Sequence, residues 1–433
     1  TASNNTGVGY YALRSNTTGE RNTAVGTRSL ENQTTGTLNT AFGYESGQAN
    51  NATGITAIGY KALEANTTAS YNTAIGYEAL KNNTTGGVNG PNVAVGKYAL
   101  LANTTGDNNV AIAALGSNTT GSDNTGVGAA ALGSNTTASY NTAVGRNALS
   151  SNTTGAGNAA FGYGALAGNT TASKNTAVGF NAAAVSTAMN QTAMGYDALR
   201  NCTTGKENTA IGVEALFTCT TGTENVAVGY YSLYNLTTGI YNTAVGPNGC
   251  LSSLTTGGSN VALGWAAGNS LTTGQQNIAV GRSSLDTCVT GEYNVSVGSY
   301  ALDACLSSNN TAVGQQVLQA VTTGNANTGI GYAAGLDVTT GGNNTFLGLN
   351  AGRSTSPSGS ITTSSNNVVL GNNNVTNLYC ADTSISSSDA RDKTDVADFT
   401  KGLDWIKALR PVTYRWDRRT WYGTDEEPYG TPD

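Results

Sequence analysis

The feature that most constrains this chain is a short motif that recurs about every 17 residues. Residues 72–86 read NTAIGYEALKNNTTG, and residues 141–155 read NTAVGRNALSSNTTG. About 22 copies can be followed from Asn5 to Asn367, and two of them replace the leading Asn, at Ile55 and Gln191. A fixed period of this length is typical of a solenoid, in which each repeat forms one coil and packs on its two neighbours.

The NTAVG segment of each repeat is rich in β-branched residues and ends in Gly, which predicts a strand of about five residues followed by a bend. Side chains alternate along a strand. We therefore expect its second and fourth positions, such as Val93 and Val95, to face the interior. The third position is almost always small, as at Ala143, and we expect it to face outward against another chain. The Leu of the AL pair, such as Leu149, is a second inward anchor.

A glycine closes nearly every predicted strand, and Ala113 is its one replacement. The simplest cause is a corner that requires a positive φ or a close approach of two backbones. A nucleotide-binding glycine loop is the functional alternative, and it is strongly disfavoured because no strand-to-helix context follows. Representative structural glycines are Gly26, Gly76, Gly145 and Gly229.

The column three residues before the Gly of TTG changes character along the chain. It carries Asn118, Asn135 and Asn152 in the first half, whereas Cys202, Cys219 and Leu254 stand there in the second half. A position that accepts Leu and Cys is expected to be interior, so the Asn residues form a buried ladder of amides. The same Asn-Thr-Thr triplets fit the N-glycosylation sequon, and surface Asn residues carrying glycans are the alternative.

The cysteines raise a second alternative, because the pairs 202/219 and 288/305 each lie one period apart. Neighbouring coils would bring their Cα atoms to about 4.8 Å, which is inside the range for a disulfide. Stacked free thiols are the other interpretation, since in-register side chains lie parallel. The chain has no His and no CxxC motif, so we expect no metal site.

Tyrosines recur beside the corner glycine and before the strand, as at Tyr77 and Tyr140. They are expected to form an outer ladder that packs on itself, and a carbohydrate-stacking surface is the alternative. The ligand would then be a glycan or receptor on a host surface.

Composition excludes several classes of function. Charged residues make up 11% of the chain and the net charge is −6, without a basic run that could neutralise phosphates, so nucleic acid is not an expected partner. No apolar stretch approaches the roughly 20 residues of a membrane span, and the chain opens inside a repeat instead of at a signal peptide. We expect no membrane insertion, no cofactor and no enzyme acting on an external substrate, and a natural start upstream of Thr1.

The N-[TS]-x-A-[VI]-G strand with its following AL pair resembles the head repeats of trimeric autotransporter adhesins over residues 1 to about 372. The resemblance implies a left-handed parallel β-roll with three rolls side by side. We therefore predict an all-β, trimeric parallel β-solenoid over residues 1–372, followed by a junction at 373–387.

After Cys380 the repeat stops and charges become frequent. Helical spacing over 399–409 and alternation over 412–416 predict a small α+β segment. The motifs SDARDK (388–393) and LRPVTYRW (409–416) resemble the start of the intramolecular chaperone domain of phage tail fibres and spikes, here residues 388–433.

The chaperone resemblance implies help in trimerisation and self-cleavage before Ser388. It assigns Ser388 as the nucleophile and Lys393 as the base, a pair that suffices when the lysine is deprotonated. Asp392 stands where the motif carries an apolar residue, and it could keep Lys393 charged. A chaperone-like cap that never cuts is the alternative.

These features favour a structural and adhesive fibre, the shaft of a phage tail fibre, located in the virion. A cell-surface adhesin or extracellular filament built from the same repeats is the alternative. A Thr array that binds ice or sugar is a third hypothesis. Adjacent Thr residues in TTG point to opposite faces, which disfavours a flat Thr grid.

Overall fold

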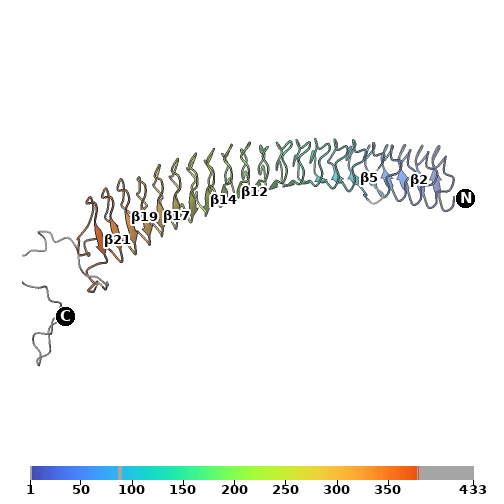
Figure 1. Ribbon diagram of the computed structural model, residues 1–433. Coiled ribbons are helices and arrows are strands. Elements are labelled where there is room, and N and C mark those ends of the chain that lie inside the picture. Colours follow the sequence, from blue (N-terminus) through green and yellow to red (C-terminus); the bar gives the residue numbers. More distant parts are fainter. Residues whose placement is uncertain (1, 86–89, 378, 380–433) are drawn as a thin grey trace, which may run out of the picture. The chain divides into compact units, whose positions relative to one another are not determined.

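The computed structural model describes residues 2–85, 90–377 and 379. Contacts divide the chain into a unit at Thr1–Thr376 and a unit at Asn377–Asp433. The first unit is an elongated stack of coils with its strands along one edge (Figure 1). The described residues form strands and turns without a helix, so none of their segments is a helix that could cross a membrane.

Each coil contributes one strand of three residues, shorter than the five predicted. The strands are β1 (Thr6–Val8), β2 (Thr23–Val25), β3 (Thr40–Phe42), β4 (Thr56–Ile58), β5 (Thr73–Ile75), β6 (Val93–Val95), β7 (Val110–Ile112), β8 (Thr125–Val127), β9 (Thr142–Val144), β10 (Ala159–Phe161), β11 (Thr176–Val178), β12 (Thr192–Met194), β13 (Thr209–Ile211), β14 (Val226–Val228), β15 (Thr243–Val245), β16 (Val261–Leu263), β17 (Ile278–Val280), β18 (Val295–Val297), β19 (Thr311–Val313), β20 (Thr328–Ile330), β21 (Thr345–Leu347) and β22 (Val368–Leu370).

Every strand pairs in parallel with the strand of the next coil, and equivalent residues lie opposite each other. Ala143 of β9, for example, lies opposite Ala160 of β10, which in turn lies opposite Ala177 of β11. The predicted parallel β-solenoid with a period of about 17 residues is therefore confirmed. With one strand per step of about 4.8 Å, 22 coils span about 100 Å.

The predicted faces of the strand were wrong, because the small third position of the motif is the one that faces the interior. Ala143 is fully buried, whereas its neighbours Thr142 and Val144 are partly exposed. Val93 and Val95 likewise flank the buried Ala94 and point outward. The small residue therefore packs inside its own chain and is not the contact with another chain that we expected.

The physical reason is the narrow interior. In β8 the third position is Gly126, and a Cβ added there would lie 2.8 Å from the Cβ of Ala114 and 3.3 Å from the Leu115 side chain. The AL pair of the preceding coil thus fills the space across from the strand. Little space remains opposite it, so close packing selects Ala and Gly for size in most coils.

In one coil a large residue stands on the strand and small residues stand opposite it. Phe346 occupies the third position of β21 and is fully buried. Glycines replace the inward leucine in its own coil and in the preceding coil, and a Cβ on Gly335 would lie 2.7 Å from the Phe346 ring. A large residue on the strand therefore requires glycines at the opposite wall, as expected when total core volume is conserved.

The inward leucines lie on a turn with unusual backbone angles. Leu149 is fully buried with φ 50°, and Leu132 and Leu216 repeat both properties. A left-handed conformation costs an L-residue about 1–2 kcal/mol. Burial of the leucine side chain contributes about 1.5–3 kcal/mol, which offsets the cost in each coil.

The corner glycines combine a positive φ with a close backbone approach. The φ angles of Gly26, Gly76, Gly145 and Gly229 are 127°, 141°, 130° and 128°. A Cβ on Gly145 would lie 2.5 Å from the carbonyl oxygen of Gly162 in the next coil. Both the angle and the contact exclude a side chain, which explains why glycine recurs there.

We expect Ala143→Leu to lower the free energy of unfolding by about 1–3 kcal/mol, because the added atoms overpack the interior. The matched change Val144→Leu adds one methylene on the outer face and should have little effect on folding. Denaturant unfolding followed by circular dichroism compares the two variants. An equal or larger effect of Val144→Leu would contradict the assigned faces.

Gly145 and Gly157 both have a positive φ, and only Gly145 also lies against the backbone of the next coil, so the pair distinguishes the cost of the backbone angle from the cost of the contact. Gly145→Ala should destabilise by several kcal/mol more than Gly157→Ala. The Gly157 φ is 68°, and a Cβ there would meet nothing within 4 Å. Gly157→Ala thus costs about 1 kcal/mol of conformational strain alone. Denaturant unfolding measures both variants. Equal losses of unfolding free energy would show that the backbone near Gly145 shifts to accept the added methyl group.

Candidate functional site

The central element of the interior is a ladder of asparagine amides. Asn118, Asn135 and Asn152 are fully buried. The Nδ2 of Asn135 donates to the Oδ1 of Asn118 at 2.8 Å, and its own Oδ1 accepts from the Nδ2 of Asn152 at 2.9 Å. The same Nδ2 also donates to the carbonyl oxygen of Ala138 at 3.0 Å. Each amide therefore binds both neighbouring coils and its own turn, and a glycan on Asn135 would have no space.

The sequence analysis missed a second ladder, made by the leading Asn of each repeat. Asn141 is fully buried, and its backbone N–H donates to the Oδ1 of Asn124 at 3.0 Å. Its Nδ2 donates to the carbonyl oxygen of Gly155 at 2.9 Å. The recurrence of Asn at this position could have revealed the ladder from the sequence. A position that only begins a strand would tolerate other residue types. This ladder satisfies backbone groups that the short strand leaves unpaired.

The ladder position becomes a thiol pair at Cys202 and Cys219. Both are fully buried, and their sulfurs lie 3.7 Å apart. This distance is a thiol hydrogen bond, far longer than the roughly 2.05 Å of a disulfide. That hydrogen bond and burial raise the pKa of Cys219, and the same bond lowers the pKa of Cys202. All five described cysteines are free, including Cys250, whose pKa burial raises to about 12.

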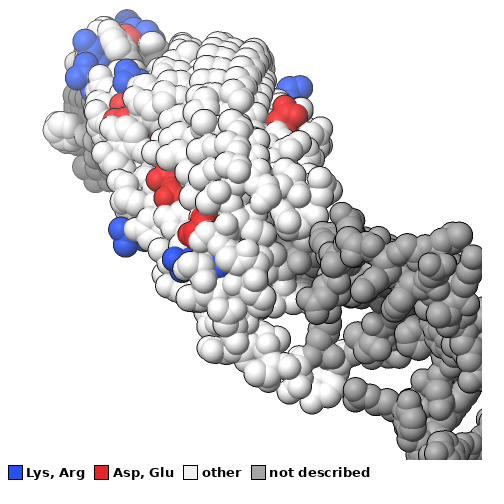
Figure 2. Space-filling view, turned by 90° about the vertical axis from the view of Figure 1, so that its left-hand side faces the viewer, with Lys and Arg blue, Asp and Glu red and all other residues white. Residues whose placement is uncertain are grey.

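Charged side chains form a line over the first coils. Glu45 is nearly buried and accepts from Arg28 and Lys61, each at 3.1 Å. Burial alone would raise the pKa of Glu45, and the hydrogen bonds from Lys61, Tyr44 and Arg28 lower it overall. The face drawn in Figure 2 carries few charged side chains on a largely uncharged surface. Among the described residues no cluster of His, Cys, Asp or Glu could hold a metal ion.

The last position of the strands is apolar along the whole stack and faces outward. The last residue of each of the 22 strands is Val, Ile, Leu, Met or Phe. Several are well exposed, including Phe42 at 58% and Leu263 at 49%. We call this row the apolar stripe. A stripe that continues over some 100 Å is far larger than the patches that monomers usually expose.

The outer tyrosines stack in columns beside the corner, as expected. The ring of Tyr60 lies 5.4 Å from Tyr44 and 5.0 Å from Tyr77, with nearly parallel planes. Tyr163, Phe180 and Tyr196 repeat this arrangement in later coils. These rings remain about half exposed. Ring faces within a column therefore cover each other, and an open face exists only where a column ends.

Asn135→Asp tests the amide ladder. The carboxylate would lose the two hydrogen bonds that Nδ2 donates and would face the oxygens of Asn118 and Ala138, so we expect a loss of several kcal/mol at pH 7. Asn135→Leu is the matched control and should cost less, because Leu254 occupies the same position.

The aspartate penalty should depend on pH. Burial would raise the pKa of the new carboxyl in the folded state above its unfolded value of about 3.9. Protonation therefore restores stability as the pH falls from 7 to 4. Thermal unfolding at both pH values measures this, and an aspartate tolerated at pH 7 would place the column at the surface.

Ser388 and Lys393, the expected helix at 399–409 and the expected strand at 412–416 lie outside the described residues. Residues 388–431 match the family model described as chaperone of endosialidase. No curated protein matches the chain. The C-terminal segment is thus similar to the chaperone of endosialidase, and it follows a β-solenoid of about 22 coils.

Proposed function

We propose that this chain is a structural and adhesive fibre, the shaft of a phage tail fibre. The observation that carries the proposal is the order of the two parts, a long solenoid followed by a segment similar to the chaperone of endosialidase. A shaft of this kind would belong to the virion. A cell-surface adhesin or extracellular filament is the second candidate, and the likeness of the repeats to adhesin heads favours it.

The proposed assembly is a homotrimer in which three solenoids lie side by side. The apolar stripe supports this proposal, because packing three stripes together would remove the exposed rings and aliphatic side chains of all 22 strands from water. This interface replaces the one expected from the small third position of the motif, which is interior. The chaperone-like segment would bring the three chains into register before the stripes pack.

We further propose that the chaperone-like segment can cut itself from the shaft. The Ser388 hydroxyl would attack the carbonyl carbon of Ser387 while Lys393, as a neutral amine, takes its proton. The C–N bond breaks as this proton passes to the departing amine, leaving an ester. Water then hydrolyses the ester, giving a carboxylate on Ser387 and a free hydroxyl on Ser388. The negative charge of Asp392 would oppose the reaction by keeping Lys393 protonated.

Intact-mass measurement of the full chain and three variants tests the junction. If the pair is active, the wild type yields a new N-terminus at Ser388, and Ser388→Ala and Lys393→Ala stay whole while still assembling. If Asp392 silences the base, the wild type stays whole and Asp392→Leu restores cutting.

Sedimentation of the same samples tests the assembly. A trimer supports the shaft, whereas a compact monomer at micromolar concentration would contradict it. Replacement of Phe161 by Ser in the apolar stripe should weaken the trimer more than replacement of Tyr163 by Ser outside it.

In the intact-mass measurement, cutting that persists in Ser388→Ala would refute the assigned nucleophile.

A further inference from the structure

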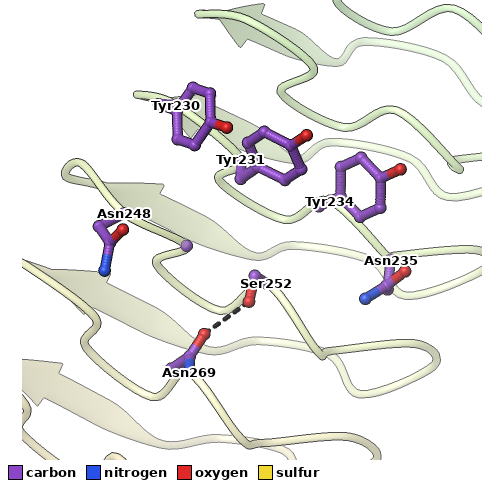
Figure 3. A pocket seen from close by; sticks show the side chains of 8 residues that line it. Tyr230, Tyr231, Tyr234, Asn235, Asn248, Ser252 and Asn269 are labelled. Carbon is purple, nitrogen blue, oxygen red and sulfur yellow. Dashed lines mark hydrogen bonds between the residues drawn. The ribbon is translucent and has the colours of Figure 1, made fainter.

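A hollow of about 370 Å³ lies on the outer side of the coils that contain β14, β15 and β16. Tyr230, Tyr231 and Tyr234 form one wall, and the side chains of Asn248, Ser252 and Asn269 lie opposite them (Figure 3). Its size falls within the roughly 300–1,000 Å³ of ligand sites. The hollow is open to solvent and is built from three successive coils.

The hollow exists because an aromatic column ends there. Tyr234 stacks on Phe217 of the preceding coil, with ring centroids 5.3 Å apart and planes within 4° of parallel. The next coil carries Ser252 at the equivalent position, as the hydrogen bond from the Asn235 N–H to the Ser252 carbonyl oxygen shows. The following coil carries Asn269. Tyr231 of the same coil also stacks on Tyr234, with ring centroids 4.7 Å apart and planes 27° from parallel. The side of these tyrosines toward the next coil therefore lines the hollow.

The polar groups around this ring suit hydroxyl recognition. The Ser252 hydroxyl donates to the Oδ1 of Asn269 at 2.5 Å, a bond that does not use the Asn269 Nδ2. Asn248 and Asn235 add two more amides to the wall, and the tyrosines add hydroxyl groups. An amide and a hydroxyl each offer a donor and an acceptor, as a sugar hydroxyl requires. The site thus combines an aromatic wall with convergent polar groups.

The charge around the hollow favours a neutral ligand. None of the residues that line it is charged. Hydrogen bonds with Tyr230 and with the Glu214 carboxylate raise the pKa of Tyr231, so the nearest identified charge is negative. A carboxylate or phosphate on the ligand would meet no cation and would be repelled by Glu214. Anionic sugars are therefore disfavoured.

We propose that this hollow binds one neutral pyranose residue of a glycan. The apolar face of the sugar would continue the column above Tyr234, and its hydroxyls would bond Asn248, Ser252 and Asn269. The proposal rests on the proposed fibre function only in that an external fibre meets glycans. The hollow itself is formed by three coils of one chain and does not depend on the trimer.

Saturation-transfer NMR and calorimetry on the full chain test the proposal. The probes are the methyl glycosides of glucose, galactose, mannose and N-acetylglucosamine, with N-acetylneuraminic acid as the anionic comparison. We expect at least one neutral glycoside to bind at least about tenfold more tightly than the anionic sugar, a difference of one charge repulsion. Binding of none of the neutral sugars, or preference for the anionic one, overturns the proposal.

Three variants localise the binding. Tyr234→Ala should weaken it about tenfold, the upper range of a stacking contact. Ser252→Tyr extends the column into the hollow and should abolish binding. The control Tyr60→Ala removes a ring whose two faces are covered by Tyr44 and Tyr77, and it should leave binding unchanged.

Outcomes for the site and for the fibre can be separated on one sample. Equal losses in Tyr234→Ala and Tyr60→Ala, or normal binding by Ser252→Tyr, would overturn the site. Thermal unfolding of both alanine variants should match, since each loses a ring from a stack. A trimer that binds no sugar refutes the site alone, whereas a monomer that binds refutes the fibre assembly and retains the site.

Discussion

The structure depends on one constraint, the contact of identical backbone positions in successive coils. Parallel pairing holds each strand opposite its equivalent, and the corner glycines bring Gly145 close to Gly162 without room for a side chain. This contact sets a step of about one strand spacing along the axis. Every side chain then lies above the residue at the equivalent position of the neighbouring coil. Ladders of Asn, thiols and rings follow from this geometry, because each position repeats itself along the axis.

The short cross-section of the coil decides which residues are inside. An ordinary core selects for apolar character, whereas this one selects first for volume, because the AL pair already fills the space facing the strand. The inner strand position is therefore Ala or Gly in most coils, with Ser296 in β18 and Val369 in the last strand, and Phe346 is accepted where glycines replace the leucines. Polar residues can also be inside when they are hydrogen-bonded, as Asn135 and Asn141 are in the two ladders. Their hydrogen bonds to adjacent coils replace those that water would make.

The period, the corner glycines and the outer tyrosine stacks could be predicted from the sequence, because repetition makes each column visible. Burial of the Asn135 column could also be argued, since Leu254 stands at the same position. The faces of the strand could not be assigned from alternation alone. Val93 and Val95 are more apolar than Ala94, and the usual rule puts the apolar face inside. Sequence alternation contains no measure of the interior width, which depends on how the Leu turn packs across the coil. The sequence motif at Ser388 and Lys393 likewise suggests self-cleavage, but it does not give the distance or orientation of the two side chains.

A repeated coil makes its interior costly to change and its exterior inexpensive to change. A substitution inside must fit two neighbouring coils, so departures there are compensated, as with Gly335 and Phe346. A substitution outside has to satisfy only local contacts. Recognition is therefore expected where an outer column is interrupted without any compensating change inside. The coil between Asn242 and Asn260 has this property, because Gly249 and Ser252 interrupt the aromatic columns while Cys250, Leu251 and Leu254 keep the interior filled. Phe217 and Tyr231 both stack on the Tyr234 ring and hold it in place, which lowers the entropy lost when a ligand packs against this aromatic wall.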